Sequence, residues 1–200
     1  MRIELLRHGE CDDQAWLRGR VDSALSVRGW QQMQAQFARL KKTETILSSP
    51  AKRCVEFSQT EIKQAWSKQA AIQSQWQERD FGIFDGLSFE TVKESYPKQL
   101  AHYLQEPYQH DIPEAELFSE FKQRIHQAWS ELIQMDVDSI LVLTHSGPMR
   151  LVLQQILGFS NQQLFQFELG YAASISIEVI ATDANPFCKL VEIVQSPRSL

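Results

Sequence analysis

Apolar residues along the chain follow two different periods, and the alternation between them predicts the secondary structure. Short apolar runs at residues 3–6, Thr45–Ser48 and Ser139–Thr144 have the length of buried strands, and a weaker run lies at residues 71–74. The unbroken run at Ser139–Thr144 is typical of a central parallel strand that is covered on both faces. Because helical periodicity follows these strands, we expect an α/β fold with a mostly parallel sheet.

Two helices in the first third of the chain have clear start signals. Ser26 is a suitable N-cap, and Leu25 and Trp30 are placed to form a hydrophobic staple around it. Ser49 followed by Pro50 reads as an N-cap with proline at the first helical position. The second helix should end near Trp66. The residues expected to face the core are Trp30, Met33, Phe37 and Leu40 in the first helix and Cys54, Ile62, Ala65 and Trp66 in the second.

The last third contains two more predicted helices and a β-rich tail. One helix starts near Pro148 and should stop at Gly158, and strands are expected at residues 165–169, 174–181 and 188–194, with a turn at residues 183–186 between the last two. The other helix is long and amphipathic, and its apolar stripe is Leu117, Phe121, Ile125, Ala128, Trp129 and Leu132.

Residues 76–113 interrupt this alternation of strands and helices. The segment begins with an aromatic, acidic stretch that contains glycine, and its short helical pieces at residues 89–95 and 98–105 are bounded by Pro97 and Pro107. It is too short to build a core of its own. We therefore interpret residues 1–200 as a single domain in which residues 76–113 form a cap excursion.

Composition restricts the classes of function. A formal net charge of −5 provides no electrostatic basis for binding nucleic acid or an anionic membrane. No run approaches the roughly 18 apolar residues of a membrane span, and no signal peptide is visible, so we expect a cytoplasmic protein. The three cysteines, Cys11, Cys54 and Cys188, form no C-x-x-C pair and predict reduced thiols rather than a disulfide or a zinc site.

A cationic or titratable residue stands at each predicted strand–turn–helix junction. The first strand ends in Arg7, His8 and Gly9, Arg53 lies one turn inside the helix after the second strand, and His145 follows the strand Ser139–Thr144. Open α/β sheets bind ligands at the carboxyl ends of their strands, and helical side chains lean toward the helix N-terminus. An arginine fork binds anions, and a histidine can act as a nucleophile. The pattern predicts a phosphoryl site built on His8.

Four motifs in this order carry a family resemblance. They are L-L-R-H-G-E around His8, S-S-P-A-K-R ending at Arg53, Q-E-R-D-F-G around Glu78 and L-T-H-S-G-P-M-R around His145. With them, the chain resembles the histidine phosphatase superfamily, which includes phosphoglycerate mutases and small phosphatases. R-G-R-V-D-S-A-L-S-V-R-G-W, E-P-Y and L-F-Q-F-E-L-G-Y-A-A are similar to the α-ribazole phosphatase group. The resemblance implies a three-layer α/β/α sandwich of the phosphoglycerate mutase type with a small cap.

The resemblance also implies roles for the motif residues. Neutral His8 would attack phosphorus and form a phosphohistidine, which water then hydrolyses. Arg7, Arg53 and His145 would surround the transferring phosphoryl group and depress the pKa of His8. Glu78 would protonate the leaving oxygen and then activate water. The family chemistry implies no metal and no other cofactor.

Four further positions are expected on the phosphate or substrate side. Gln14 stands where many relatives have an asparagine that contacts the phosphate, and Ser146 replaces a usual glycine, adding a hydroxyl group or offering its backbone N–H. Arg20 and Gly147 complete this set of expected binding residues. In the cap, Asp85 stands where a glutamate is common.

The expected function is hydrolysis of a small phosphorylated metabolite, and the expected substrate is α-ribazole 5′-phosphate of cobalamin synthesis. One alternative is a phosphotransferase of the phosphoglycerate mutase type, although those relatives usually have a longer cap. A second alternative is a binding or scaffold protein with an inactive site, and the intact set of motif residues argues against it. The sequence does not predict the oligomeric state.

Overall fold

One six-stranded sheet organises the molecule, with the strand order β3-β2-β4-β1-β5-β6. The computed structural model describes residues 1–107, 112–182 and 186–196. Four strands are mutually parallel: β1 (Arg2–Arg7), β2 (Thr45–Ser48), β3 (Ala71–Ile72) and β4 (Ser139–Thr144). Two antiparallel strands extend the sheet beyond β1: β5 (Ser174–Ile180) and β6 (Phe187–Val194). The predicted mostly parallel sheet is confirmed.

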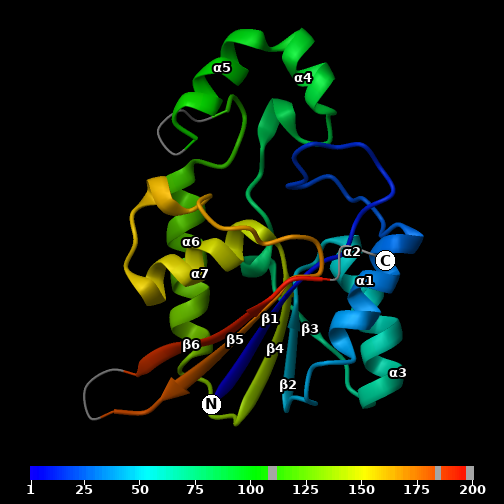
Figure 1. Cartoon of the computed structure of the whole chain (residues 1–200), viewed down its shortest axis with the longest axis vertical. Helices are drawn as coiled ribbons and strands as arrows, with labels where there is room; N and C mark the ends of the chain where they lie inside the picture. Colours follow the sequence, from blue (N-terminus) through cyan, green and yellow to red (C-terminus); the bar gives the residue numbers. More distant parts are fainter. Residues whose placement is uncertain (108–111, 183–185, 197–200) are drawn as a thin grey trace.

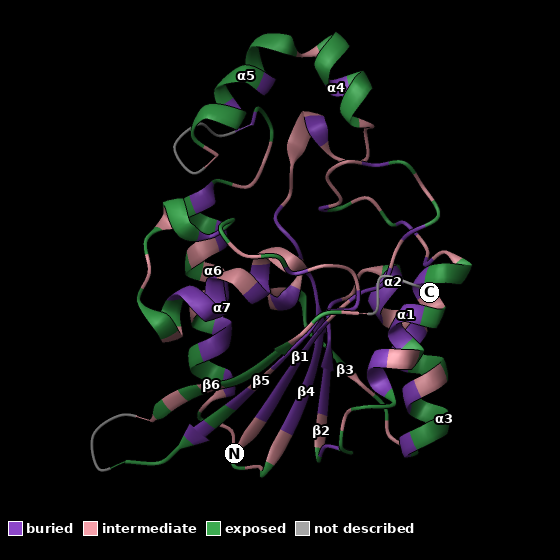
Figure 2. Ribbon diagram, viewed as in Figure 1, coloured by how far each residue is buried: buried purple, intermediate pink, exposed green. Residues whose placement is uncertain are grey.

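Helices cover both faces of the sheet, which gives three layers (Figure 1). One face carries α1 (Val27–Phe37), α2 (Lys52–Phe57), the π-helical segment η1 (Ser58–Ile62) and α3 (Lys63–Trp66); the other carries α6 (Phe118–Leu132) and α7 (Ser146–Leu157). Side chains of a strand alternate between faces. Leu6 of β1 accordingly packs with α1–α3, whereas Ile3 and Leu5 pack with α6 and α7. The buried strands lie between these layers in Figure 2, and the predicted sandwich is confirmed.

The segment between β3 and α6 forms the cap, beyond the carboxyl ends of the parallel strands (Figure 1). It contains η2 (Ser74–Trp76), η3 (Gly82–Phe84), α4 (Phe89–Ser95) and α5 (Pro97–Gln105). A small apolar cluster centres on Phe84, Val92, Leu100, Tyr103 and Ile112. Trp16 and Leu17, from the loop after β1, pack against this cluster, so the cap is held to the main body by shared apolar contacts.

The predicted strand at residues 165–169 is wrong. After η4 (Asn161–Gln163) the chain runs through turns and bends to residue 170. Its carbonyl groups bind guanidinium groups in place of a neighbouring strand. Arg150 donates to the carbonyls of Leu164 and Phe167, and Arg7 donates to that of Leu169. Both donors belong to other elements, Arg7 to β1 and Arg150 to α7, so the local apolar alternation does not reveal these contacts.

Two predicted helix starts are also wrong by a short distance. The helix after β2 begins at Lys52 with Ala51 as its N-cap, and the Ser49 hydroxyl lies 2.8 Å from Nε2 of His145. Helix α7 begins at Ser146, before Pro148, with His145 as its N-cap.

Other local predictions agree with the structure. Ser26 caps α1 by accepting from the backbone N–H of Gly29 at 2.9 Å, and Gly158 ends α7 with φ of 72°. Within the predicted turn at residues 183–186, residues 183–185 lie outside the described residues, as do residues 108–111 of the predicted cap. Among the helices of the described residues, none combines the length and apolar character that crossing a membrane requires.

Candidate active site

Strand β1 brings His8 to the carboxyl edge of the sheet with its ring held in one orientation. The His8 backbone N–H donates to the carbonyl of Thr144 at 3.1 Å, and ring Nδ1 lies 2.8 Å from the carbonyl oxygen of Gly9. A carbonyl only accepts, so Nδ1 carries the proton and Nε2 keeps its lone pair. Burial, followed by the charges of Arg53 and Arg7, lowers the pKa of His8 well below its ordinary value. His8 is therefore a neutral imidazole with a nucleophilic Nε2.

Arg53 lies in the first turn of α2 and is fully buried. Its Nε has no hydrogen-bond partner within the described ranges of the chain. The two Nη atoms donate to carbonyls of the loop after β1, those of Arg18 at 2.9 Å, Gly19 at 3.3 Å and Val21 at 2.9 Å. Burying a charged group with one donor left open is costly unless a ligand completes its hydrogen bonds. Arg53 is thus prepared to receive an anion.

Arg7 stacks on an aromatic ring beside His8. Its guanidinium carbon lies 4.5 Å from the ring centroid of Tyr171, and its Nη1 donates to the carbonyl of Leu169. Its Nε, like that of Arg53, has no partner in the described part of the chain. Stacking fixes the plane of the guanidinium and leaves a donor edge open, which suits the binding of a phosphoryl oxygen.

His145 is the N-cap of α7 and lies against His8, with ring centroids 5.1 Å apart. Its Nε2 lies 2.8 Å from Ser49 Oγ, which accepts the backbone N–H of Ala51 at 3.3 Å. The Ser49 hydroxyl can thus donate to Nε2, which leaves the proton of the neutral ring on Nδ1. Burial, and then the charge of Arg53, lowers the pKa of His145 well below its ordinary value. Nδ1 has no partner among the described residues, so its N–H is available to a ligand.

Glu78 follows η2 and is only 7% exposed. Its Oε2 accepts the backbone N–H of Gly147 and its Oε1 accepts that of Arg79, both at 3.0 Å. Burial raises the pKa of Glu78, although these two hydrogen bonds and the charges of Arg7 and Arg53 oppose the rise. A carboxyl with a raised pKa keeps its proton to higher pH, which is the property a general acid needs.

An ion pair behind Glu78 holds the segment that carries it. Arg124 of α6 donates through Nη1 to the carbonyls of Gln75 at 2.7 Å and Gln77 at 3.0 Å. Its Nε and Nη2 donate to the two carboxylate oxygens of Glu116 at 2.8 and 2.7 Å. A bidentate pair of this kind has a defined geometry. The helix α6 therefore fixes the backbone on which Glu78 is placed.

The loop after β1 is held along both of its edges. Arg53 binds carbonyl groups of this loop, as described above. Asp85 of the cap accepts the backbone N–H groups of Gly19 at 3.0 Å, Arg20 at 2.6 Å and Val21 at 3.3 Å. One buried cation and one cap carboxylate thus determine the path of the loop that adjoins the candidate phosphate site.

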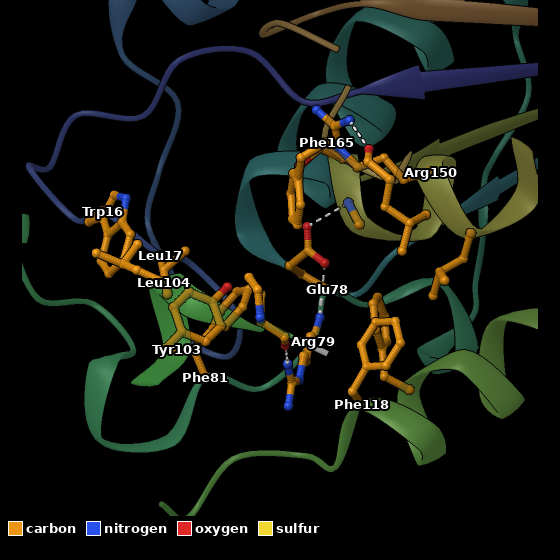
Figure 3. Close-up of a pocket in the computed structure, with 16 residues that line it drawn as sticks. Trp16, Leu17, Glu78, Arg79, Phe81, Tyr103, Leu104, Phe118, Arg150 and Phe165 are labelled. Atoms are coloured by element: carbon orange, nitrogen blue, oxygen red, sulfur yellow. Dashed lines mark hydrogen bonds between the residues drawn. The ribbon is translucent and has the colours of Figure 1, made fainter. Parts of the chain in front are cut away.

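A cavity of about 320 Å³ opens beside Glu78, between the cap and the main body (Figure 3). Most of its wall is apolar, with six aromatic side chains: Trp16, Phe81, Tyr103, Phe118, Phe121 and Phe165. Glu78, Ser146 and Gly147 line this cavity, whereas His8 and His145 do not. Glu78 is therefore situated at the boundary between the buried cationic cluster and an apolar cavity.

The structure brings five of the predicted residues together, namely Arg7, His8, Arg53, Glu78 and His145, since their rings or charges act on one another. Ser146 and Gly147 lie on the cavity wall, as expected for substrate-side residues. Among the described residues, no hydrogen bond or ion pair joins Gln14 or Arg20 to these five. Gln14 is exposed, and Arg20 is exposed and pairs with Asp80, its Nε lying 3.7 Å from Oδ2. Their roles, like those of the five, remain predictions.

Several neighbours of the site were missed. Tyr171 lies with its ring centroid 5.9 Å from that of His8, and its hydroxyl accepts from Arg18 at 3.0 Å. The only signal for Tyr171 was its place in the tail stretch similar to α-ribazole phosphatases. Arg124 carried no signal, because an arginine on an amphipathic helix ordinarily faces solvent. Within residues 1–107, 112–182 and 186–196, no three His, Cys, Asp or Glu side chains are grouped to hold a metal ion.

Comparison with known proteins agrees with the motifs. The histidine phosphatase superfamily (branch 1) model matches residues 3–191. A Hydrogenobacter thermophilus protein provisionally named phosphoserine phosphatase 2 is 24% identical over 89% of both chains. The 6-phosphofructo-2-kinase/fructose-2,6-bisphosphatase of Gallus gallus is 30% identical over 81% of this chain but only 34% of its own length.

A solved structure shares the fold. The α-ribazole phosphatase from Shigella flexneri superposes with a TM-score of 0.82 and 20% identity, covering 96% of each chain. The sandwich described above is therefore the phosphoglycerate mutase-like fold. Because the family model spans nearly all of it, this chain belongs to branch 1 of the histidine phosphatase superfamily.

Proposed function

We propose that this protein hydrolyses a small phosphate monoester through a phosphohistidine at His8. One observation carries the proposal: the bond between Nδ1 and the Gly9 carbonyl leaves Nε2 of His8 with a free lone pair, beside the charges of Arg7 and Arg53. A neutral imidazole fixed next to open cationic donors is what nucleophilic attack on a phosphoryl group requires.

In the first half-reaction, the lone pair of His8 Nε2 forms a bond to phosphorus while the ester P–O bond breaks. The leaving oxygen takes the proton of Glu78, and the alcohol departs. Open N–H groups of Arg7, Arg53 and His145 donate to the phosphoryl oxygens, where charge develops. In the second half-reaction, water attacks phosphorus, Glu78 takes the proton of the water, and the P–N bond breaks. Inorganic phosphate leaves, and neutral His8 and protonated Glu78 are restored.

For the substrate we propose α-ribazole 5′-phosphate. The cavity beyond Glu78 carries an aromatic and aliphatic wall, which suits a leaving group that ends in an apolar ring system. The two arginines on this wall, Arg79 and Arg150, donate to backbone carbonyls. A leaving group of the size of serine or glycerate would leave most of the apolar wall uncovered. The name of the Shigella structure supports the same substrate.

The intermediate tests the chemistry. After rapid denaturation in base, the enzyme treated with radiolabelled substrate should retain label that acid removes, since a phosphohistidine is stable in base and labile in acid. His8→Ala should carry no label and show no turnover, whereas His102→Ala, a change at an exposed histidine on α5, should behave like the unmodified protein. Wild-type turnover in His8→Ala would overturn the proposed mechanism.

A substrate panel tests the leaving group. We expect kcat/KM for α-ribazole 5′-phosphate to exceed that for 3-phosphoglycerate and phosphoserine by about 100-fold, the discrimination that burial of one apolar ring provides. Equal and weak rates on all three would reject this substrate and leave a general phosphatase. Transfer of the label to 2-phosphoglycerate, in place of release as inorganic phosphate, would instead identify a mutase.

A further inference from the structure

A second cavity, also of about 320 Å³, lies where α1 ends against β1, β5 and β6. It shares no lining residue with the cavity beside Glu78. The proposed phosphatase chemistry uses none of its side chains. Apolar residues (Leu40, Val191 and Val194) share its lining with polar and charged ones, of which the argument uses Glu4, Gln36, Arg39, Lys41, Ser174 and Glu192.

Three of these polar side chains are buried in positions that an apolar residue would ordinarily occupy. Glu4 is 6% exposed, Gln36 is 1% exposed and Ser174 is 2% exposed. Glu4 lies on the same face of β1 as Leu6, and Gln36 precedes Phe37 at the buried end of α1. Burial of polar groups destabilises a fold unless their hydrogen bonds are satisfied. Strand β1, helix α1 and strand β5 each place a buried polar side chain at this cavity. This convergence indicates a site built for a ligand.

The inner end of the cavity offers hydrogen-bond acceptors. Gln36 donates through Nε2 to Ser174 Oγ at 2.5 Å, and its Oε1 has no protein partner in the part of the chain that the structure describes. Glu4 Oε2 accepts the hydroxyl of Ser176 at 2.6 Å, and its Oε1 lies 3.6 Å from Arg2 Nε. An ammonium group has three N–H donors and a positive charge. It would therefore donate to the Gln36 oxygen and to the Glu4 carboxyl at once, beside the guanidinium of Arg2.

The outer end of the cavity carries the opposite charge. Arg39 and Lys41 are exposed, and neither side chain forms an ion pair or a hydrogen bond with any residue that the structure describes. Glu192 also lines the cavity, and its charge acts on Glu4. Of the two carboxyl groups, Glu4 is buried and Glu192 is exposed, so a buried carboxyl lies inward of the two exposed cations. We propose that the cavity binds a small zwitterion, with its ammonium group on Glu4 and Gln36 and its anionic group on Arg39 and Lys41.

Calorimetric titration with matched probes tests this site. The probes are the ω-amino acids 4-aminobutyrate and 6-aminohexanoate, with butyrate and butylamine as carriers of one charge each. We expect saturable binding of at least one ω-amino acid and binding about tenfold weaker or absent for the two single-charge probes. If no ω-amino acid binds, or if a single-charge probe binds as tightly, the proposal is overturned.

Variants locate the binding. Glu4→Gln keeps the shape of the side chain and removes its charge, and it should weaken binding of the ω-amino acid at least about tenfold. The double change Arg39→Gln and Lys41→Gln, at two exposed positions, should do the same, and it tests the site if Glu4→Gln does not fold. Lys63→Gln, at an exposed lysine of α3, is the control for removal of a surface cation away from this cavity. Equal affinity in the double variant and in Lys63→Gln would reject the site. Calorimetry measures binding and not turnover. A lack of phosphatase activity would therefore reject the proposed function without affecting this test.

Discussion

The backbone N–H of Gly147 donates to Glu78 Oε2 at 3.0 Å, and a Cβ atom at residue 147 would lie 2.0 Å from Glu78 Oε1. The turn that follows His145 therefore touches the candidate acid directly. Only glycine allows the backbone to approach the carboxylate this closely. The position of Glu78 depends on the absence of a side chain on the neighbouring helix.

Gly147→Ala should displace the Glu78 carboxyl and reduce turnover of alkyl phosphates by about 100-fold, the usual effect of a misplacement of about 1 Å. Gly158→Ala is the matched control, because a Cβ there meets nothing within 4 Å. It should cost about 1 kcal/mol in stability, from its left-handed backbone, and leave turnover unchanged. Steady-state kinetics of both variants checks this, and wild-type turnover in Gly147→Ala would contradict the assigned position of Glu78.

Glu78→Gln should reduce turnover of alkyl phosphates by about 100- to 10,000-fold. The loss should be smaller for p-nitrophenyl phosphate, whose leaving group needs no proton. Burial raises the pKa of Glu78, so the acid form persists above the pH at which an ordinary carboxyl ionises. The rate on alkyl phosphates should fall as pH rises through this raised pKa, and Glu78→Gln should lack that fall. A uniform loss across leaving groups would argue against an acid role.

Glu116→Gln should disturb Glu78 indirectly, by breaking the bidentate pair with Arg124. We expect kcat to fall about tenfold with little change in KM, because the backbone that carries Glu78 loses its support. Glu56→Gln removes one partner of an exposed pair, Lys52 and Glu56 at 3.9 Å, and should change neither parameter. Identical kinetics for the two variants would show that the Arg124 pair does not position Glu78.

The two buried histidines should make the fold sensitive to acid. His8 and His145 have pKa values lowered well below 6.5 in the native state, so the unfolded chain binds more protons once the pH falls below about 6.5. The free energy of unfolding should therefore fall on acidification, by up to about 1.4 kcal/mol per pH unit for each histidine. Urea denaturation from about pH 7 to about pH 5 measures this slope.

Substitutions should distinguish the contribution of these histidines to the pH dependence of stability from that of other groups. His8→Asn keeps a donor for the Gly9 carbonyl and should flatten the pH slope, whereas His102→Gln, at an exposed position, should not. The same slope in all three proteins would mean that other groups cause the loss of stability in acid.

Phe165 at the cavity wall should influence substrate choice without affecting the fold, since its side chain is 60% exposed. Phe165→Ser should lower kcat/KM about tenfold for substrates with a ring in the leaving group and leave glycerol phosphate unaffected, because the ring loses apolar contact. Phe187→Ser, at a phenylalanine of β6 that is 57% exposed, is the control for surface changes. Parallel effects on both classes of substrate would exclude Phe165 from the leaving-group site.

The sequence predicted the sheet and the residues at its strand ends because these depend on short-range patterns. His8, Arg53 and His145 are each placed by the strand immediately before them, so their convergence followed from the topology of parallel strands. The surrounding residues depend on contacts between distant segments. Ser49 reads locally as an N-cap, yet its hydroxyl serves the ring of His145, and no local pattern reveals that choice.

Gly9 shows that a residue in a recognised motif can be required by packing. A glycine at the end of a strand ordinarily lets the backbone turn sharply. In the structure a Cβ at residue 9 would lie 2.2 Å from the carbonyl oxygen of Gly29, at the start of α1. The glycine is needed because a helix packs against the turn. The contact between the turn at Gly9 and the start of α1 joins two separate segments. Hydrophobic periodicity does not describe such a contact.

The loop held between Arg53 and Asp85 has a consequence for exchanging caps between relatives. Asp85 belongs to the cap and Arg53 to the main body, and each binds a different set of backbone atoms in the same four residues, 18–21. A graft that replaced only the cap would exchange the carboxylate that accepts these N–H groups and alter the support of the loop that contacts Arg53. A chimera designed for a new leaving-group specificity should therefore take both the cap and the loop at residues 18–21 from the same relative.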